Sequence, residues 1–136
     1  MAENIRLEVV TPEKSVVGDE AKIVMAPGSL GEFGVLSGHT PFMTSLKVGS
    51  IHYEDAQGKE HYVFVSGGFA EALPDRVTVL ADSAERRKDI DIERAKKAMQ
   101  RAEERLTRER TEDIDFVRAQ AALLRAITRI RLAETR

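Results

Sequence analysis

Arginines in the last third of the chain are its clearest candidates for chemistry. Arg118, Arg125 and Arg129 follow one another at spacings of seven and four, which places them on one stripe of a helix. No acidic residue lies between Asp115 and Glu134 to offset their charge. Guanidinium groups match the geometry of phosphates and carboxylates, so the stripe suits an anionic partner. A solvated helix face explains it equally well, and spacing alone leaves both interpretations open.

A glycine-rich segment at 27–41 is a second candidate, because it reads PGSLGEFGVLSGHTP. A phosphate-binding loop carries Gly-Lys-Ser/Thr or opens directly into a helix, and this segment does neither. We therefore expect its glycines to supply positive φ angles for turns and to leave an exposed contact surface. The residues expected at its tip are Glu32, Phe33, Val35 and Leu36.

The three histidines suggest neither a metal site nor a catalytic site. His52 and His61 fall on the two sides of a predicted hairpin, but no cysteine and no evident third ligand accompany them. We expect a solvated cross-strand pair. His39 lacks a Ser or Cys nucleophile pattern nearby, so we expect a turn or interface residue there. The sequence predicts no catalytic residue and no metal site.

Composition divides the chain in two. Up to Ala84 there are 6 Lys and Arg against 12 Asp and Glu, and from Glu85 onward there are 15 against 11. All 9 Gly and all 4 Pro lie in the first part. We therefore predict two domains, 1–84 and 85–136. No cysteine and no long apolar run is present, so we expect a reduced, unexported protein that does not span a membrane.

The first domain reads as short strands. Ile5, Leu7 and Val9 alternate with polar residues, as on a strand with one buried face. Further apolar runs lie at 15–17 and 21–26, and the alternation returns at 76–80. Many short strands without a helical period predict an antiparallel β-sandwich.

The best-defined turn is Asp-Ala-Gln-Gly at 55–58. A loop of these four residues would place three pairs opposite one another: Glu54 with Lys59, Tyr53 with Glu60, and His52 with His61. One face of the hairpin would then carry Ile51, Tyr53, Tyr62 and Phe64.

The second domain has a helical period. A first helix at 91–108, with Asp89 or Asp91 as its N-cap, has the stripe Ala95, Ala98, Met99, Ala102 and Leu106. A second helix, beginning after Asp113 or Asp115, has the stripe Phe116, Ala119, Leu123, Ala126, Ile127 and Ile130. The short linker at 109–113 predicts an antiparallel hairpin, which makes the whole chain α+β, strands before helices. Because alanine buries little area, we expect weak packing that lets the hairpin detach.

Four segments together resemble the epsilon subunits of bacterial and chloroplast ATP synthases. They are PGSLGEFGVLSGHTP at 27–41, VSGGFAE at 65–71, VTVLADSAER at 77–86 and DIDFVRAQAALLRAITRI at 113–130. The resemblance implies a non-catalytic central-stalk subunit on the cytoplasmic side of the bacterial inner membrane, touching the membrane only indirectly. Implied partners are the gamma subunit and the c-subunit ring. The implied rotor interface consists of Glu32, Phe33, Val35, Leu36 and His39.

The resemblance also implies a regulatory hairpin. In that family the hairpin folds against the sandwich or extends into the catalytic head, where it meets the alpha and beta subunits and blocks ATP hydrolysis. Ile90-Asp91-Ile92-Glu93-Arg94-Ala95 fits the family's ATP-binding pattern Ile/Leu-Asp-x-x-Arg-Ala. The implied ATP-binding residues are Glu85, Ile90, Asp91, Arg94, Ala95, Arg101, Arg125 and Arg129. ATP would be a regulatory ligand of the compact state and not a required cofactor.

Two other classes of function remain open at this point. The first is an interaction module unrelated to a rotor, with a basic helical arm that binds acidic partners. Nucleic acid is not an expected partner, because the arm's excess of positive charge is modest and it lacks base-stacking aromatics. The second is an enzyme, which the absence of a plausible site disfavours. The coupling ion, proton or sodium, is not predicted.

Overall fold

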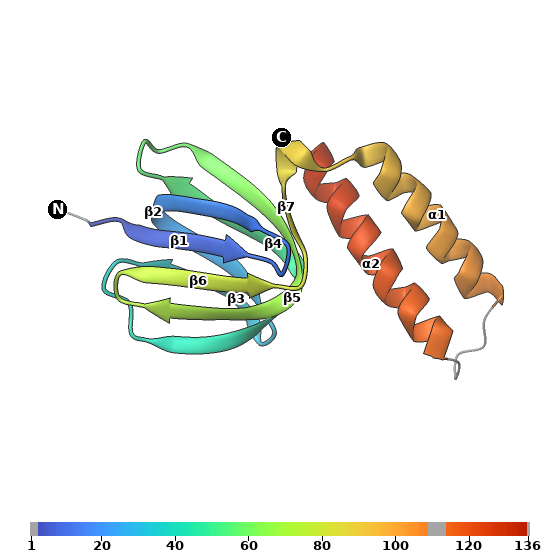
Figure 1. Cartoon of the computed structure of the whole chain (residues 1–136), viewed down its shortest axis with the longest axis horizontal. Coiled ribbons are helices and arrows are strands. Elements are labelled where there is room, and N and C mark those ends of the chain that lie inside the picture. The colour runs from blue at the N-terminus through green and yellow to red at the C-terminus, as the bar shows by residue number, and fades with distance from the viewer. Residues whose placement is uncertain (1–2, 109–113, 136) are drawn as a thin grey trace. The chain divides into compact units, whose positions relative to one another are not determined.

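The computed structural model describes residues 3–108 and 114–135, and the chain forms two compact units, Met1–Arg87 and Lys88–Arg136 (Figure 1). The first unit contains the strands and the second contains the helices, which confirms the predicted α+β class. The division falls at 87/88, whereas the sequence predicted 84/85, because residues 84–86 still pair with the sheet.

The sandwich unit contains seven strands: β1 (Ile5–Val10), β2 (Ser15–Gly28), β3 (Gly31–Leu36), β4 (Phe42–Asp55), β5 (Glu60–Leu73), β6 (Arg76–Ala81) and β7 (Ala84–Arg86). Their order is β1-β6-β5-β4-β2-β3, with β7 on β5. Because β1 also pairs with β2, the sheet closes around one core. The pairings are antiparallel except between β1 and β6, which run parallel.

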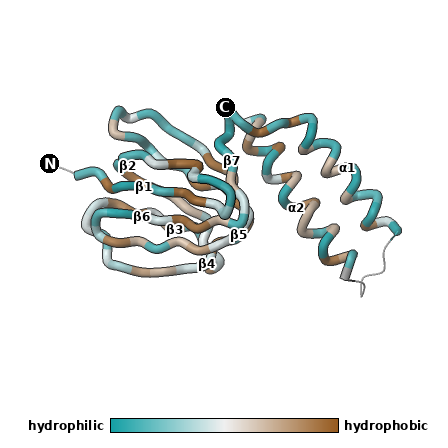
Figure 2. The backbone as a smooth tube through the Cα atoms, in the orientation of Figure 1, coloured by the Kyte–Doolittle hydropathy of each residue, from teal (hydrophilic) through white to brown (hydrophobic). Residues whose placement is uncertain are grey.

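Alternation builds this core. Ile5, Leu7 and Val9 are fully buried, as are Val77 and Val79 on the neighbouring β6. The two apolar runs at 15–17 and 21–26 belong to one continuous strand, β2. In Figure 2 the strands carry most of the hydrophobic stretches, while α1 is mostly hydrophilic.

The β4–β5 register differs from the predicted one by a single residue. Tyr53 lies opposite His61, and Glu54 lies opposite Glu60. The loop is one residue shorter than predicted, because the Asp55 N–H donates to the Lys59 carbonyl (2.8 Å) and Gly58 takes a left-handed φ of 85°.

This one-residue slip reverses which side chains share a face. Tyr62 and Phe64 therefore lie on the face opposite Ile51 and Tyr53, and the prediction that all four share one face is wrong. His52 and His61 are likewise on opposite faces, so they form no cross-strand pair.

A short 3-10 helix, η1 (Arg87–Asp89), spans the boundary between the two units. The second unit then contains α1 (Ile92–Arg108) and α2 (Ile114–Glu134). The N-cap of α1 is Asp91, whose Oδ1 accepts the Arg94 N–H at 3.0 Å. The predicted linker at 109–113 lies outside the described residues.

The two helices lie side by side and antiparallel, as predicted (Figure 1). Their most buried residues include pairs of alanines seven apart, Ala95 with Ala102 on α1 and Ala119 with Ala126 on α2. The larger predicted stripe residues, such as Leu106 and Ile127, are only partly buried. Alanines allow close approach of the helices but contribute little buried area.

Candidate functional site

The glycine-rich segment presents a different tip from the predicted one. The turn between β2 and β3 is Ser29–Leu30, and the Leu30 side chain is 100% exposed. Ser29 is held to β4, since its N–H donates to the Ser45 carbonyl at 2.9 Å. Gly31 follows with a φ of 136°. Leu30 was not among the predicted residues, although its position between two glycines was a usable signal.

The predicted rotor-interface residues are not all exposed. Glu32 and Leu36 lie at the surface, and Phe33 is partly buried. Val35 is fully buried opposite Val24 of β2, so it is not presented at the surface as expected. The reason is alternation along β3, which turns Val35 into the core.

His39 is a turn residue that packs on an aromatic side chain. Its Nδ1 lies 2.7 Å from the Thr40 carbonyl, and its ring lies 5.1 Å from that of Phe42. Phe42 in turn makes an edge contact with Phe33 at 5.1 Å. Phe33 and His39, two of the predicted interface residues, are therefore joined through Phe42.

A second exposed apolar surface, which the sequence did not predict, lies on β4, β5 and β6. Phe69 of β5 stands opposite Leu80 of β6, and each side chain is 58% exposed. Met43 of β4, opposite Glu71, is 68% exposed. We call Met43, Phe69 and Leu80 the outer apolar patch. Exposed apolar side chains that cluster in this way are typical of protein interfaces.

Seven of the eight predicted ATP-binding residues lie on the hairpin unit. On α1, Arg94 is exposed in the first turn and Arg101 is exposed just past the middle of the helix. On α2, Arg125 is partly exposed just past the middle and Arg129 is partly exposed four residues further on. Because the helices are antiparallel, the start of α1 lies near the end of α2, and the middles of the two helices lie near each other. Arg94 and Arg129 are therefore toward the same end of the hairpin, and Arg101 and Arg125 are near its middle.

The other predicted ATP-binding residues have structural roles. Asp91 caps α1, while Ile90 and Ala95 are 8% and 4% exposed. Glu85 lies in β7 of the sandwich unit, opposite Phe64. Only Glu85 is therefore separated from the others by the boundary between the units.

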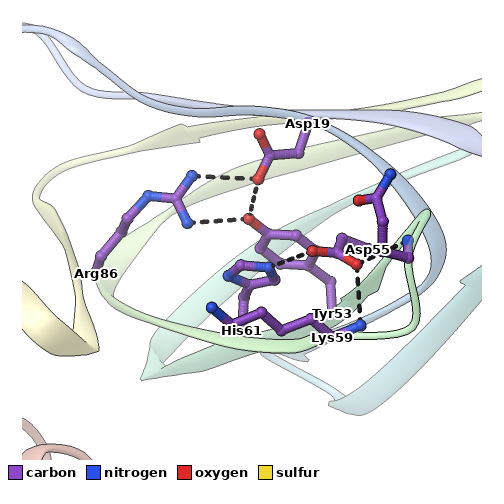
Figure 3. A network of polar contacts seen from close by, with 7 residues as sticks. Asp19, Tyr53, Asp55, Lys59, His61 and Arg86 are labelled. Carbon is purple, nitrogen blue, oxygen red and sulfur yellow. Dashed lines mark hydrogen bonds and ion pairs between the residues drawn. The ribbon is translucent and has the colours of Figure 1, made fainter.

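A polar cluster that the sequence did not predict joins three strands of the sandwich (Figure 3). The Tyr53 hydroxyl of β4 donates to Asp19 Oδ2 of β2. Arg86 of β7 donates from Nη1 to the Tyr53 oxygen at 3.1 Å and from Nη2 to Asp19 Oδ2 at 3.2 Å. We call Asp19, Tyr53 and Arg86 the Arg86 cluster.

Electrostatics favour the protonation states that this cluster needs. Burial, and then the hydrogen bond to Asp19, raise the pKa of Tyr53 to about 12. The hydrogen bond from Tyr53, aided by Arg86, lowers the pKa of Asp19. At neutral pH the cluster is thus a neutral phenol between a carboxylate and a guanidinium. No local pattern predicts it, because the partners are 33, 34 and 67 residues apart.

His61 lies beside the Arg86 cluster, on the β-hairpin formed by β4 and β5. Its ring stacks on that of Tyr53 at 4.8 Å, and its Nε2 lies 2.7 Å from Asp55 Oδ2. The contact with His61, together with the N–H groups of Lys59 and Gln57, lowers the pKa of Asp55. These contacts make Asp55 and His61 residues of the turn structure.

The histidines do not form a metal site. On the other face of the β4–β5 hairpin, the His52 ring stacks on the Tyr62 ring with 5.1 Å between centroids. The His52 Nε2 lies 3.3 Å from Glu60 Oε2. Across residues 3–108 and 114–135, no group of three His, Cys, Asp or Glu side chains is arranged to hold a metal ion. Within the same residues, no helix is long and apolar enough to cross a membrane.

Known families match both units. Residues 4–87 match the β-sandwich domain of the ATP synthase delta/epsilon chain, and residues 88–134 match the long α-helix domain of the same chain. The ATP synthase epsilon chain of Desulfosudis oleivorans is 69% identical over 106 residues, which cover 78% of this chain and 80% of the relative. That of Desulforapulum autotrophicum is 67% identical over 107 residues, 79% of each chain.

Two solved structures have the same fold at low sequence identity. A chain of the Euglena gracilis mitochondrial ATP synthase assembly OSCP/F1/c-ring has a TM-score of 0.79 at 23% identity, covering 94% of this chain and 80% of its own length. A chain of the Tetrahymena thermophila mitochondrial ATP synthase central stalk/c-ring has a TM-score of 0.57 at 11% identity, with coverages of 97% and 95%. From the two domain matches and the close relatives, the chain belongs to the family of ATP synthase epsilon chains, the epsilon subunits of F-type ATP synthases.

Proposed function

We propose that this chain is a central-stalk subunit that couples the rotor to the catalytic head, and that its hairpin restrains ATP hydrolysis. The sandwich would bind the gamma subunit and the c-subunit ring on the cytoplasmic side of a bacterial inner membrane, touching the membrane only through that ring. The coupling ion would be the proton or sodium. The observation that carries the regulatory part is a separate, alanine-packed hairpin with a basic second helix.

Rotor binding is supported by the surface of the sandwich. The Ser29–Leu30 turn projects a fully exposed leucine, with exposed Glu32 close behind it in the chain. The outer apolar patch offers a broader area of the same character. Apolar side chains beside acidic ones suit a protein partner that carries apolar and basic groups.

Inhibition is supported by the weak packing and the charge of the hairpin. Because the alanine contacts between α1 and α2 bury little area, the two helices can separate from each other at low cost. On α2, Arg118 and Arg125 make no ion pair within the described part of the chain. Acidic segments of the beta subunits would supply partners for such arginines when the hairpin extends.

ATP binding is supported by four arginines that lie between one end and the middle of the hairpin, two on each helix. A triphosphate held by Arg94 or Arg101 on one helix and by Arg125 or Arg129 on the other would bind only while the helices stay paired. ATP would therefore shift the hairpin toward its compact state. The further contribution of Glu85 stays a prediction.

Removing the hairpin tests inhibition in the assembled synthase. Truncation before Asp89 is expected to raise the rate of ATP hydrolysis while the shortened subunit still copurifies with gamma. An unchanged rate with normal assembly would contradict the inhibitory role. Failure to copurify would instead contradict the assignment of rotor binding to the sandwich.

Calorimetry tests the ATP site on the isolated chain. The double variant Arg125→Ala, Arg129→Ala is expected to lose ATP binding. The matched control Arg118→Ala, Arg131→Ala removes the same charge from the same helix and is expected to bind ATP like the unmodified chain. Equal binding by the two double variants would show that ATP does not use the proposed site.

A further inference from the structure

The last strand of the sandwich is too short to be held by backbone pairing alone. β7 contains three residues, Ala84, Glu85 and Arg86, which pair with Val65, Phe64 and Val63 of β5. A strand this short, directly before a unit boundary, is expected to fray unless side chains fasten it. Two consecutive arginines provide such contacts.

Arg86 holds β7 in place from one face of the β-hairpin formed by β4 and β5. Its guanidinium donates to the Tyr53 hydroxyl and to Asp19, and Tyr53 also donates to Asp19, so the three groups form a closed ring of contacts (Figure 3). The Arg86 side chain is 22% exposed, and that of Asp19 is 34% exposed. Solvent therefore screens this ion pair less than it screens a fully exposed one.

Arg87 fastens the chain from the other face. Its guanidinium carbon lies 4.3 Å from the centre of the Tyr62 ring, within cation–π range. Tyr62 follows His61 in the strand and so points away from the face that carries Tyr53. The ring of Tyr62 is itself stacked on His52. Successive arginines thus contact opposite faces of β4 and β5.

Helix α1 begins at Ile92, five residues after Arg87. Asp91 accepts the Arg94 N–H through Oδ1 and the Ala95 N–H through its carbonyl, both at 3.0 Å, which fixes the first turn. Lys88, Asp89 and Ile90 lie between these two fixed points. The boundary between the compact units and the boundary between the two family matches both fall at 87/88.

We propose that Arg86 and Arg87 are positioning residues that anchor the exit of the hairpin from the sandwich, so that movement of the hairpin turns only on Lys88, Asp89 and Ile90. The proposal rests on the proposed function to the extent that the hairpin moves. It assigns Glu85 permanently to the sandwich, and it gives the Arg86 cluster a role in regulation as well as in stability.

Residue-resolved amide exchange on the full chain tests the anchor. The β7 amides are expected to exchange more slowly than those of Lys88 and Asp89. Arg86→Gln is expected to accelerate β7 exchange about tenfold or more, because hydrogen bonds to a charged group are lost. Arg86→Lys keeps the positive charge but replaces the planar guanidinium, with its two donor nitrogens, by a single ammonium group. This variant is expected to give an intermediate exchange rate.

The matched control is Arg76→Gln on β6, where the arginine is exposed. This variant is expected to leave β7 exchange unchanged. The amides of Val77 and Val79 report whether each variant keeps its core. Unchanged β7 exchange in Arg86→Gln with an intact core would overturn the anchor.

Distances between paired spin labels test the positioning role, and the cysteine-free chain makes such labelling clean. Labels at Lys47→Cys and Lys88→Cys are expected to give one narrow distance distribution with or without ATP. The double variant Arg86→Gln, Arg87→Gln is expected to broaden it, and Arg76→Gln is expected not to. A broad distribution in the otherwise unmodified chain, or no broadening in the double variant, would refute the proposal.

A second pair, Lys47→Cys with Lys96→Cys on α1, reports on the hairpin itself. Its distribution is expected to shift when ATP is added. If the Lys47–Lys96 distribution does not shift while the Lys47–Lys88 pair behaves as described, the proposed ATP switch is contradicted and the proposed anchor is supported. The two pairs therefore separate failure of the anchor from failure of the proposed regulation.

Discussion

Tyr53 and Asp19 are joined by a hydrogen bond although 34 residues separate them in the chain (Figure 3). The phenol donates to a carboxylate that also accepts from Arg86. Because the same hydroxyl accepts a bond from Arg86, it connects β2, β4 and β7 at one point.

Replacing Tyr53 by Phe removes the hydroxyl but keeps the ring. Asp19 and Arg86 then each lose one hydrogen bond, and we expect the free energy of unfolding to fall by about 1 to 2 kcal/mol. Urea denaturation measures this change. The control is Tyr62→Phe, since the Tyr62 hydroxyl makes no hydrogen bond among the described residues, and we expect a change within about 0.5 kcal/mol. Equal losses in the two variants would contradict the proposed role of the hydroxyl.

The raised pKa of Tyr53 predicts a loss of stability at high pH. The folded-state value is about 12, against about 10 for an unperturbed tyrosine. The folded protein binds this proton more tightly than the unfolded chain does. The stability that the protonated Tyr53 hydroxyl contributes to the folded state is therefore complete below about pH 10. It disappears as the pH rises through about 12.

Tyrosinate absorbance measures this titration directly, because the chain has only 2 tyrosines. We expect one to ionise near pH 12 and Tyr53→Phe to abolish that step. A Tyr53 signal that titrates near the unperturbed value would show that the phenol is not held as described.

Gly68 is a position where any side chain must clash. Its φ is 110°, and an added Cβ would lie 2.1 Å from the Leu80 carbonyl oxygen. Gly38 also has a positive φ, 83°, but nothing lies within 4 Å of its added Cβ. We expect Gly38→Ala to cost about 1 to 2 kcal/mol from backbone strain alone. Gly68→Ala is expected to cost at least about 3 kcal/mol, because overpacking adds to that strain. Equal unfolding free energies for the two variants would refute the close approach of β5 to β6.

Ala102 tests the alanine packing of the hairpin. It is 3% exposed, so Ala102→Leu must push α1 and α2 apart at a cost of about 1 to 3 kcal/mol. Amide exchange is expected to accelerate in the helices and to stay unchanged in β1 and β6, because the two units have separate cores. Gln100→Leu, at an exposed position of α1, is the control and is expected to leave exchange unchanged. Acceleration throughout the chain would show that the units unfold together.

Short-range patterns in the sequence were enough to predict much of the fold. The alternation of Ile5, Leu7 and Val9 predicted β1, and its inward residues are fully buried. The spacing of apolar residues predicted both helices, and Asp91 was correctly identified as a possible N-cap. These features depend on residues within a turn or two of each other, where local geometry decides the outcome.

Tertiary structure alone decided the features that bear most on the candidate sites. A loop shortened by one residue set the β4–β5 register, and with it the stacking of Tyr53 on His61 and the separation of His52 from His61. The assignment of residues 84–86 to the sandwich depends on Asp19, Tyr53 and β5, all distant in the chain. The sequence by itself determined the family, both helices, the strands with the clearest alternation, and the charge of the hairpin. Contacts between distant strands decided which side chains meet, because their energies depend on register and burial that no local segment contains.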